Sequence, residues 1–179
     1  MDNDRQTIAI TKPSVARYIA QAAMVASAYA ALTLALAPIS FSEKQFRISE
    51  ALTILPAFVP AAVPGLFVGC VISNLVSPIG LPDLVFGSLA TLAAAFLTRR
   101  LASLASGAHP VLRAFIAATP PVAVNVIVIG AMLVFIFDVP FGVALIGVLV
   151  GQAVVCYGLG VPLYLLLVKL ASRRWPWAR

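Results

Sequence analysis

Five polar side chains stand inside or beside long apolar runs of this sequence: Arg47, Glu50, Asn74, Asn125 and Gln152. Together their types offer hydrogen-bond donors and acceptors, which suits recognition of a small polar molecule. In membrane proteins, such side chains usually face the interior of the helix bundle or a cavity, because a polar group in lipid is unfavourable. The set therefore predicts one pocket for a ligand that carries both donors and acceptors.

Four of these residues, and Asp83 as well, also have a purely structural interpretation. Arg47 and Glu50 are three positions apart and would pair with each other on one helix face. Asp83 stands at a predicted helix start, where an acidic side chain suits the helix dipole. Asn125 and Gln152 would serve as hydrogen-bonded links between neighbouring helices. The residues by themselves leave both interpretations open.

The rest of the chain indicates what would position such a pocket. Of its 179 residues, 62% are apolar and 10% are charged, against about 25% charged residues in soluble domains. A membrane-spanning helix needs about 20 mostly apolar residues, and uncharged runs extend over 18–42, 51–82, 84–98, 114–137 and 139–168. A soluble domain of this length could not bury so many apolar residues. The sequence predicts an all-helical, polytopic membrane protein.

The run over 51–82 decides the number of spans, because it is too long for one untilted helix and contains Pro56, Pro60 and Pro64. One kinked helix or two short helices would fit it. Two helices give six spans and place ten of the 12 basic residues on one side, which the positive-inside rule assigns to the cytoplasm. We expect both termini there, as tails 1–14 and 173–179. The membrane domain 15–172 would comprise spans at 15–37, 48–59, 62–76, 82–103, 111–136 and 140–172.

Small residues form rows at helical spacing. In the first span, Ala22, Ala26 and Ala30 recur every four residues, so one side of this helix would let another helix approach closely. Packing within the bundle and docking of another membrane protein both fit this row. Parallel rows are Ala23, Ser27 and Ala31 in the same span, and Gly65, Gly69, Ser73 and Ser77 in the third, where packing within the bundle is the better interpretation.

Motifs of several other functions are absent from the sequence. It contains no GxxxxGK[ST] phosphate loop, so the chain is not expected to use ATP itself. It contains no HExxH or GxSxG motif and no metal-type spacing of Cys70 and Cys156, which are interpreted as small packing residues. We expect no catalytic residue, no metal site, no cofactor bound by this chain and no nucleic-acid partner.

Five segments are similar to the QueT family: AALTLALAPISF, QFRISEALTILP, VPGLFVGCVISNL, DLVFGSLATLAAAFLT and GQAVVCYGLGVPL, within residues 22–163. The resemblance implies the substrate-binding S component of an energy-coupling-factor transporter in a prokaryotic cell membrane. Such a protein would have six helices, a pocket near the outer face, and a lid between the first two spans that includes Glu43 and Lys44. Its partners would be a transmembrane coupling protein and two ATPases. The resemblance makes Ala22, Ala26 and Ala30 the docking face.

The ligand implied by the resemblance is a queuosine precursor, 7-cyano- or 7-aminomethyl-7-deazaguanine. Glu50 would accept the two N–H donors of the guanine edge, while Phe46, Phe86 or Tyr157 would cover its flat ring. An acidic residue often stands in the family where this chain has Gln152, and a glutamine cannot pair with a ligand ammonium, which leaves the uncharged cyano base as a candidate. The expected ligand-binding residues are Glu50, Arg47, Phe46, Asn74, Asn125, Gln152, Asp83 and Tyr157.

Two alternatives stay open at this point. In the first, the chain would be an S component for another small vitamin or nucleobase. In the second, it would be a structural or assembly protein of the membrane that binds no ligand. A ligand-binding panel separates them, because the first alternative predicts a different ligand and the second predicts none.

Overall fold

The computed structural model describes residues 14–41 and 46–174, with side chains up to residue 171. In these ranges every regular element is a helix. The α-helices are α1 (Val15–Ala35), α2 (Ala37–Ser40), α3 (Ala62–Asn74), α4 (Ser88–Leu104), α5 (Pro110–Phe137), α6 (Phe141–Val155) and α7 (Val161–Arg174). One 3₁₀-helix, η1 (Ile48–Ala57), and two π-helical turns, η2 (Asp83–Gly87) and η3 (Cys156–Gly160), complete the described elements. The expected lid residues Glu43 and Lys44 lie outside the described residues.

Four continuous helical segments are long and apolar enough to cross a membrane: Val15–Ala35, Asp83–Leu104, Pro110–Phe137 and Phe141–Ala171. The expectation of an all-helical protein with several membrane-spanning helices is thus confirmed. Helices also occupy the other two expected ranges, as η1 and α3, but these have only 10 and 13 residues. The total of six spans therefore stays a prediction.

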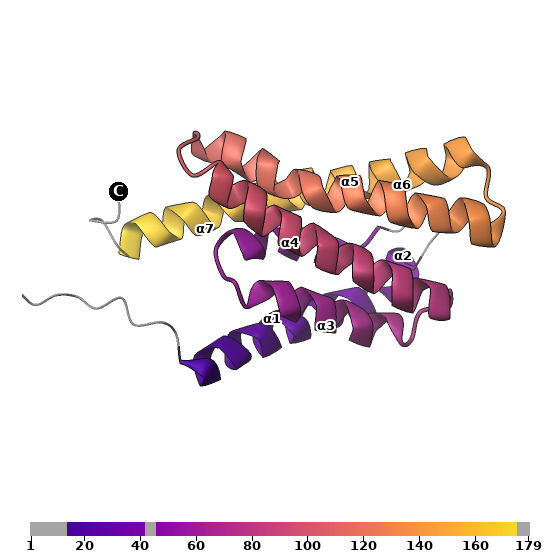
Figure 1. Ribbon diagram of the computed structural model, residues 1–179, viewed down its shortest axis with the longest axis horizontal. Helices are drawn as coiled ribbons and strands as arrows, with labels where there is room; N and C mark the ends of the chain where they lie inside the picture. Colours follow the sequence, from indigo (N-terminus) through magenta and orange to yellow (C-terminus); the bar gives the residue numbers. More distant parts are fainter. Residues whose placement is uncertain (1–13, 42–45, 175–179) are drawn as a thin grey trace, which may run out of the picture.

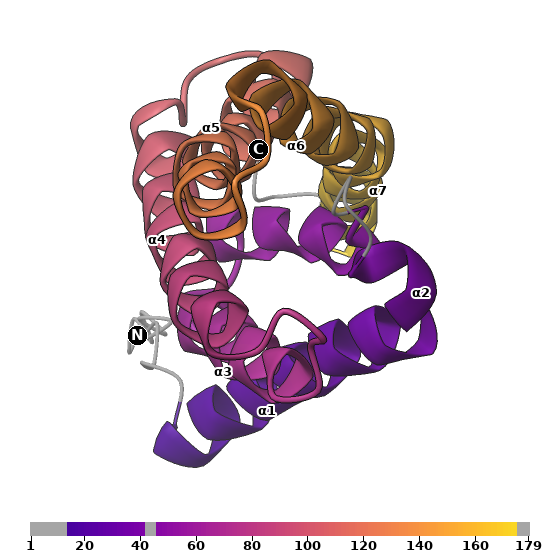
Figure 2. The same cartoon turned by 90° about the vertical axis from the view of Figure 1, so that its right-hand side faces the viewer.

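The long helices run side by side along the long axis of the molecule (Figure 1). The start of α1, the end of α7 and the connection between α4 and α5 lie at one end, which we call the terminal end (Figure 1). Helix α2 and the connection between α5 and α6 lie at the other end, which we call the site end. Viewed from the site end, α1 and α3 lie together on one side of the bundle and α6 on the other (Figure 2).

Helix η1 is the central element of the fold. It contacts α1, α3, α4, α5, α6, η3 and α7, although its ten residues would be too few to span a membrane as a separate α-helix. In a 3₁₀-helix the side chains at positions i and i+3 lie directly above one another. Arg47, which caps η1, therefore shares a face with Glu50 and Thr53, and all three are buried. The polar side chains of this segment point into the bundle.

Glycines fix how closely α1 and α3 approach. A Cβ atom on Gly65 would lie 2.6 Å from the carbonyl oxygen of Ala22, and one on Gly69 would lie 2.7 Å from that of Ala26. Both distances are shorter than van der Waals contact, so only glycine fits at these positions. The packing interpretation of the glycine row on α3 is confirmed. This contact holds Tyr29 of α1 against Leu66 and Cys70 in a buried cluster.

Candidate functional site

A buried ion pair joins the start of η1 to the start of η2. Arg47, just before η1, donates from Nη2 to both carboxylate oxygens of Asp83, at 2.7 and 2.6 Å. The two side chains are 4% and 0% exposed. Breaking such a pair by removing one partner would leave an uncompensated buried charge. The ion pair of Arg47 is thus made with Asp83, 36 positions away, and the interpretation in which Arg47 and Glu50 merely pair with each other is wrong.

Further contacts hold Asp83 in place. Ser77 Oγ donates to its carboxylate at 2.7 Å, and Asn74 Nδ2 donates to its backbone carbonyl at 2.9 Å. Gly87 lies against this group: a Cβ atom there would be 2.9 Å from both Asn74 Nδ2 and Asp83 Oδ1. Glycine at this position leaves room for the ion pair, which therefore depends on α3 and η2 together.

Glu50 lies one 3₁₀ turn further along η1 and has a different environment. It is 1% exposed, and its Oε1 accepts a hydrogen bond of 2.6 Å from the hydroxyl of Tyr29. Its Oε2 is buried and accepts no hydrogen bond of good geometry from the described residues, although the side chain of Asn125 is near enough to act on this carboxyl group. Buried polar atoms nearly always have a partner, so an orphaned carboxylate oxygen marks a place where an additional donor would be strongly favoured.

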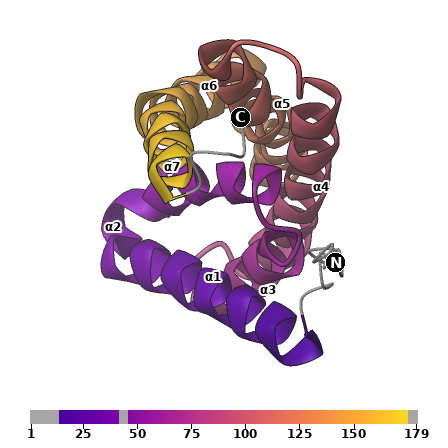
Figure 3. The ribbon, with the colours of Figure 1, turned by 90° about the vertical axis from the view of Figure 1, so that its left-hand side faces the viewer.

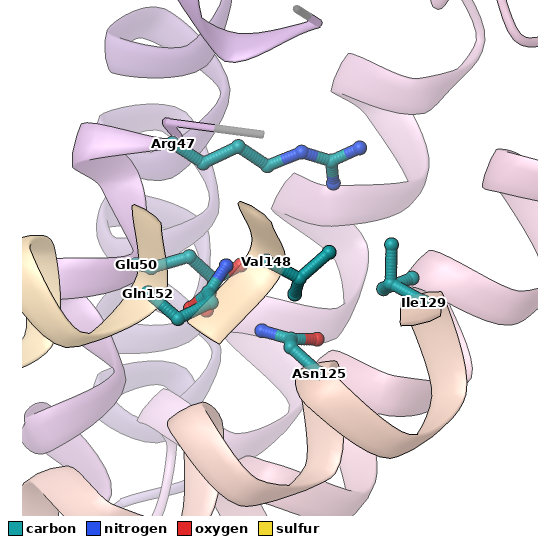
Figure 4. Close-up of a pocket in the computed structure, with 6 residues that line it drawn as sticks. All are labelled: Arg47, Glu50, Asn125, Ile129, Val148 and Gln152. Carbon is teal, nitrogen blue, oxygen red and sulfur yellow. The ribbon is translucent and has the colours of Figure 1, made fainter. Parts of the chain in front are cut away.

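This carboxylate faces a narrow pocket within the bundle. Arg47 and Glu50 line it from η1, Asn125 and Ile129 from α5, and Val148 and Gln152 from α6 (Figure 4). On both α5 and α6 the two lining residues are four positions apart, so they share a helix face. Figure 4 shows the side chains of Glu50, Gln152 and Asn125 directed toward a common space, with Ile129 and Val148 as its apolar wall.

The pocket has the composition of a binding site for a small polar molecule. Its carboxylate accepts hydrogen bonds, its two amides both donate and accept, and its two aliphatic side chains can cover an apolar face. The space among these groups is too narrow to admit a water-sized sphere. The site is closed in this conformation, and a ligand enters only when the surrounding side chains or helices move apart.

The pocket contains four of the eight residues expected to bind ligand: Glu50, Arg47, Asn125 and Gln152. Asn74 and Asp83 belong to the adjoining ion-pair group instead. Phe46 is half-buried and does not line the pocket.

Two aromatic candidates for covering the ligand ring lie elsewhere. Tyr157 is hydrogen-bonded to Thr119 at 3.2 Å and packs against Phe115. Phe86 is exposed and lines an outward-facing groove on α5. The pocket walls are aliphatic, so no aromatic side chain of the described part stacks against the space between Glu50 and Asn125.

The row proposed for docking occupies two environments. Ala26 and Ala30 are 6% and 7% exposed, and the backbone of Ala26 faces Gly69 of α3. Ala22 is half-buried, whereas the parallel row of Ala23, Ser27 and Ala31 is exposed. In this conformation Ala26 and Ala30 pack within the bundle, which is the alternative interpretation of the row.

Tyr29, Ile129 and Val148 were not predicted as site residues. Ile129 and Val148 carry no signal of their own, because isoleucine and valine are common throughout this chain. Tyr29 does carry a sequence signal. It is a tyrosine in an alanine-rich, uncharged run, and a buried tyrosine hydroxyl usually requires a hydrogen-bond partner.

The chain is similar to a known protein family. A family model described as QueT transporter matches residues 19–169 of the chain, close to the bounds of the resemblance in the sequence. No curated protein and no solved structure matches. Among the described residues no cluster of three or more His, Cys, Asp or Glu side chains has the arrangement of a metal site.

Proposed function

Since the chain belongs to the QueT transporter family, the S-component family of energy-coupling-factor transporters, we propose that it captures a queuosine precursor and delivers it through an ATP-driven coupling module. Membership of this family implies a multi-pass membrane transport protein that binds a small molecule and works with partner modules. The identity of the ligand, the residues that bind it, and the prokaryotic cell membrane as its location are the proposal.

The observation that carries the proposal is the orphaned Oε2 of Glu50 in the pocket. A 7-deazaguanine presents two neighbouring N–H donors on its guanine edge, from the ring nitrogen and the exocyclic amine. A carboxylate accepts such a pair side by side, here one N–H at Oε2 and the other at the second lone pair of Oε1, beside the bond from Tyr29. Asn125 and Gln152 supply amide donors for the carbonyl oxygen of the base, and Ile129 and Val148 cover its ring. Oε2 of Glu50 thereby gains the donor that it lacks.

Charge favours the 7-cyano base. The charge of Arg47 is balanced by Asp83, which leaves Glu50 as the net charge of the pocket. When Glu50 accepts the guanine edge, no second acid of the pocket lining remains for the ammonium of the 7-aminomethyl base, because Gln152 is neutral. A buried ammonium without an acidic partner is unfavourable. The nitrile of the cyano base needs only a hydrogen-bond donor.

The proposal places the terminal end in the cytoplasm and the pocket toward the outer face. Six spans, with both termini and the tails 1–14 and 173–179 inside, would count η1 and α3, each extended by the residues that flank it, as a hairpin that crosses twice. Arg17, Arg99, Arg100 and Arg113 all belong to the terminal end, as the positive-inside rule requires for a cytoplasmic side.

Docking of the coupling module is proposed for α1. The exposed row of Ala23, Ser27 and Ala31, with Ala22 near it, carries only small side chains, which suits close approach of another membrane helix. Ala26 and Ala30 stay candidates for docking only if α3 moves away from them, since α3 packs on this side of α1.

A ligand panel tests the proposal. The purified protein is titrated with 7-cyano-7-deazaguanine, 7-aminomethyl-7-deazaguanine, guanine, riboflavin, thiamine and biotin, and its melting temperature is followed. We expect the cyano base to raise the melting temperature most, and Glu50→Gln to abolish that rise. The matched control Asp138→Asn, which also removes one acid at the site end but lies outside the pocket, is expected to keep it. Stabilisation by another vitamin alone would indicate an S component of different specificity, and no stabilisation by any compound would favour a structural or assembly protein.

A further inference from the structure

A second groove, distinct from the pocket of Glu50, lies at the terminal end of the molecule, which faces the viewer in Figure 3. It has a volume of about 630 Å³ where η1 ends, α4 ends and α5 begins. Its lining includes Ala57, Phe96, Arg99, Arg100, Ser103 and Arg113. The groove therefore combines three guanidinium groups with hydroxyl and apolar side chains.

Each of the three arginines is held at the groove by a different contact or by burial. Arg99 donates from Nη1 to the backbone carbonyl of Pro56 at 3.3 Å. Arg100 lies over the ring of Phe96, with its guanidinium carbon 5.0 Å from the ring centre, a cation–π contact that fixes its direction. Arg113 is half-buried, and its Nε is a buried donor with no partner in the described part of the chain.

No acidic side chain of the described residues lies at this end. Asp83 and Asp138 both lie at the opposite end of the molecule. Asp83 begins the helical segment that carries Arg99 and Arg100 near its other end. Asp138 follows the last residue of α5, and Arg113 lies in the first turns of that helix. Glu50 is buried against Tyr29. Within residues 14–41 and 46–171, no acid thus compensates the positive charge of the groove, and the amino-terminal end of α5 adds the positive end of a helix dipole. An anion is the complementary ligand.

The position of the groove indicates what carries that anion. It lies where spanning segments end, at the depth of lipid headgroups, and Phe96 on its lining is 49% exposed on a membrane-spanning helix. A phosphodiester beside the arginines would have its glycerol and first acyl carbons beside Phe96 and Ala57. A soluble anion would make no use of the apolar lining.

We propose that this groove is a binding site for the headgroup of an anionic phospholipid, with the phosphodiester held by Arg99, Arg100 and Arg113. Basic pockets between helices at the membrane surface bind such headgroups. The inference rests on the membrane placement of the helices and is independent of which base occupies the pocket of Glu50.

The test measures lipid retention on the purified full-length protein by native mass spectrometry, with phosphatidylglycerol and phosphatidylcholine of the same acyl chains offered in equal amounts. We expect the wild-type protein to prefer phosphatidylglycerol. Each basic residue near an anionic lipid contributes about fivefold in affinity, so Arg99→Gln with Arg113→Gln should lower phosphatidylglycerol retention about 25-fold. Arg17→Gln is the matched control, since Arg17 is an exposed arginine of the terminal end that does not line the groove, and it should retain wild-type preference.

A second variant separates charge from folding. Arg99→Lys with Arg113→Lys keeps both charges and is expected to retain most of the lipid preference. We expect its melting temperature to equal that of the glutamine variant, so that the two variants differ in charge and not in folding. Equal retention of the two lipids by the wild-type protein, or unchanged retention in the glutamine variant, would overturn the proposal. Competition of inorganic phosphate with phosphatidylglycerol at millimolar concentration would also overturn it, because the groove would then be a site for soluble anions.

Discussion

The hydroxyl of Tyr29 donates a hydrogen bond of 2.6 Å to Oε1 of Glu50, and this contact ties α1 to η1. With one carboxylate oxygen held by α1, the other is directed into the pocket between α5 and α6. The first helix thereby sets the orientation of the group that we propose recognises the ligand, although Tyr29 itself does not line the pocket.

Tyr29→Phe should therefore weaken ligand binding while the fold persists. A hydrogen bond to a charged group contributes about 1.5–3 kcal/mol, so we expect affinity for the cyano base to fall at least about tenfold in a calorimetric titration. Thr33→Val is the matched control, because it removes another buried hydrogen bond between α1 and η1, the 2.6 Å contact with Ser49, without touching Glu50. Equal losses of affinity in the two variants would contradict a specific role for Tyr29.

Gln152→Glu should change which base is preferred. The substitution adds an acid at the pocket with little change in shape, and this acid can pair with the ammonium of the 7-aminomethyl base. We expect the ratio of the two affinities to move toward the aminomethyl base by about tenfold or more, the size of a charge-assisted hydrogen bond. The measurement is a titration of both bases against both proteins. A ratio that stays constant would place Gln152 away from the 7-substituent.

Gly87→Ala should destabilise the protein through the ion-pair group. The added methyl would lie 2.9 Å from Asn74 Nδ2 and Asp83 Oδ1, and overpacking of this kind typically costs about 1–3 kcal/mol. We expect a lower melting temperature in detergent. Gly142→Ala, a helical glycine with nothing within 4 Å of an added Cβ, should leave it unchanged or raise it slightly. Equal melting temperatures for the two variants would show that the Gly87 contact relaxes without cost.

The Arg47–Asp83 pair should be non-additive. Arg47→Met or Asp83→Leu alone leaves a buried charge without its partner, which costs about 3–5 kcal/mol, whereas removing both leaves none. We expect the double variant to be more stable than either single variant in thermal unfolding. Losses that simply add would mean that the 2.6 Å contact contributes little to folding.

Ser27→Trp should separate capture from delivery. Ser27 is exposed on α1, so a large side chain there would block close approach of a partner helix but leave the pocket intact. We expect normal ligand binding with loss of co-purification with the coupling module. Ala93→Trp, on the exposed side of α4, is the control that should keep both. Normal co-purification of the Ser27 variant would remove this side of α1 from the docking surface.

The sequence predicted where the helices lie, because membrane-spanning helices are specified by long apolar runs and by the prolines that divide them. It also placed Glu50, Arg47, Asn125 and Gln152 in one set, since polar side chains in such runs have few places to point except the interior. Those inferences need only composition and local spacing.

What the sequence did not predict depends on contacts between distant positions. Asp83 as the partner of Arg47 is such a case, because local spacing points to nearby acids such as Glu50 and not to a residue 36 positions away. The burial of Ala26 and Ala30 is another, since the row is equally smooth whether α3 or a partner protein covers it. Tyr29 falls between these cases: a tyrosine in an uncharged run is a signal for a buried hydroxyl contact that the sequence analysis did not use, and only the approach of α1 to η1 identifies Glu50 as the acceptor.

Helix η1 has a mechanical consequence that follows from its winding. Ten residues at the 3₁₀ rise of about 2.0 Å each extend about 20 Å, whereas an α-helix of the same length would extend about 15 Å. This length lets one short segment carry Glu50 of the ligand pocket near its start and Ala57 of the arginine groove at its end. The segment thus connects the two sites, and Arg99 binds its last turn by donating a hydrogen bond to the carbonyl of Pro56. A shift of η1 along its axis would therefore displace lining residues at both sites, Glu50 in the pocket and Ala57 in the groove.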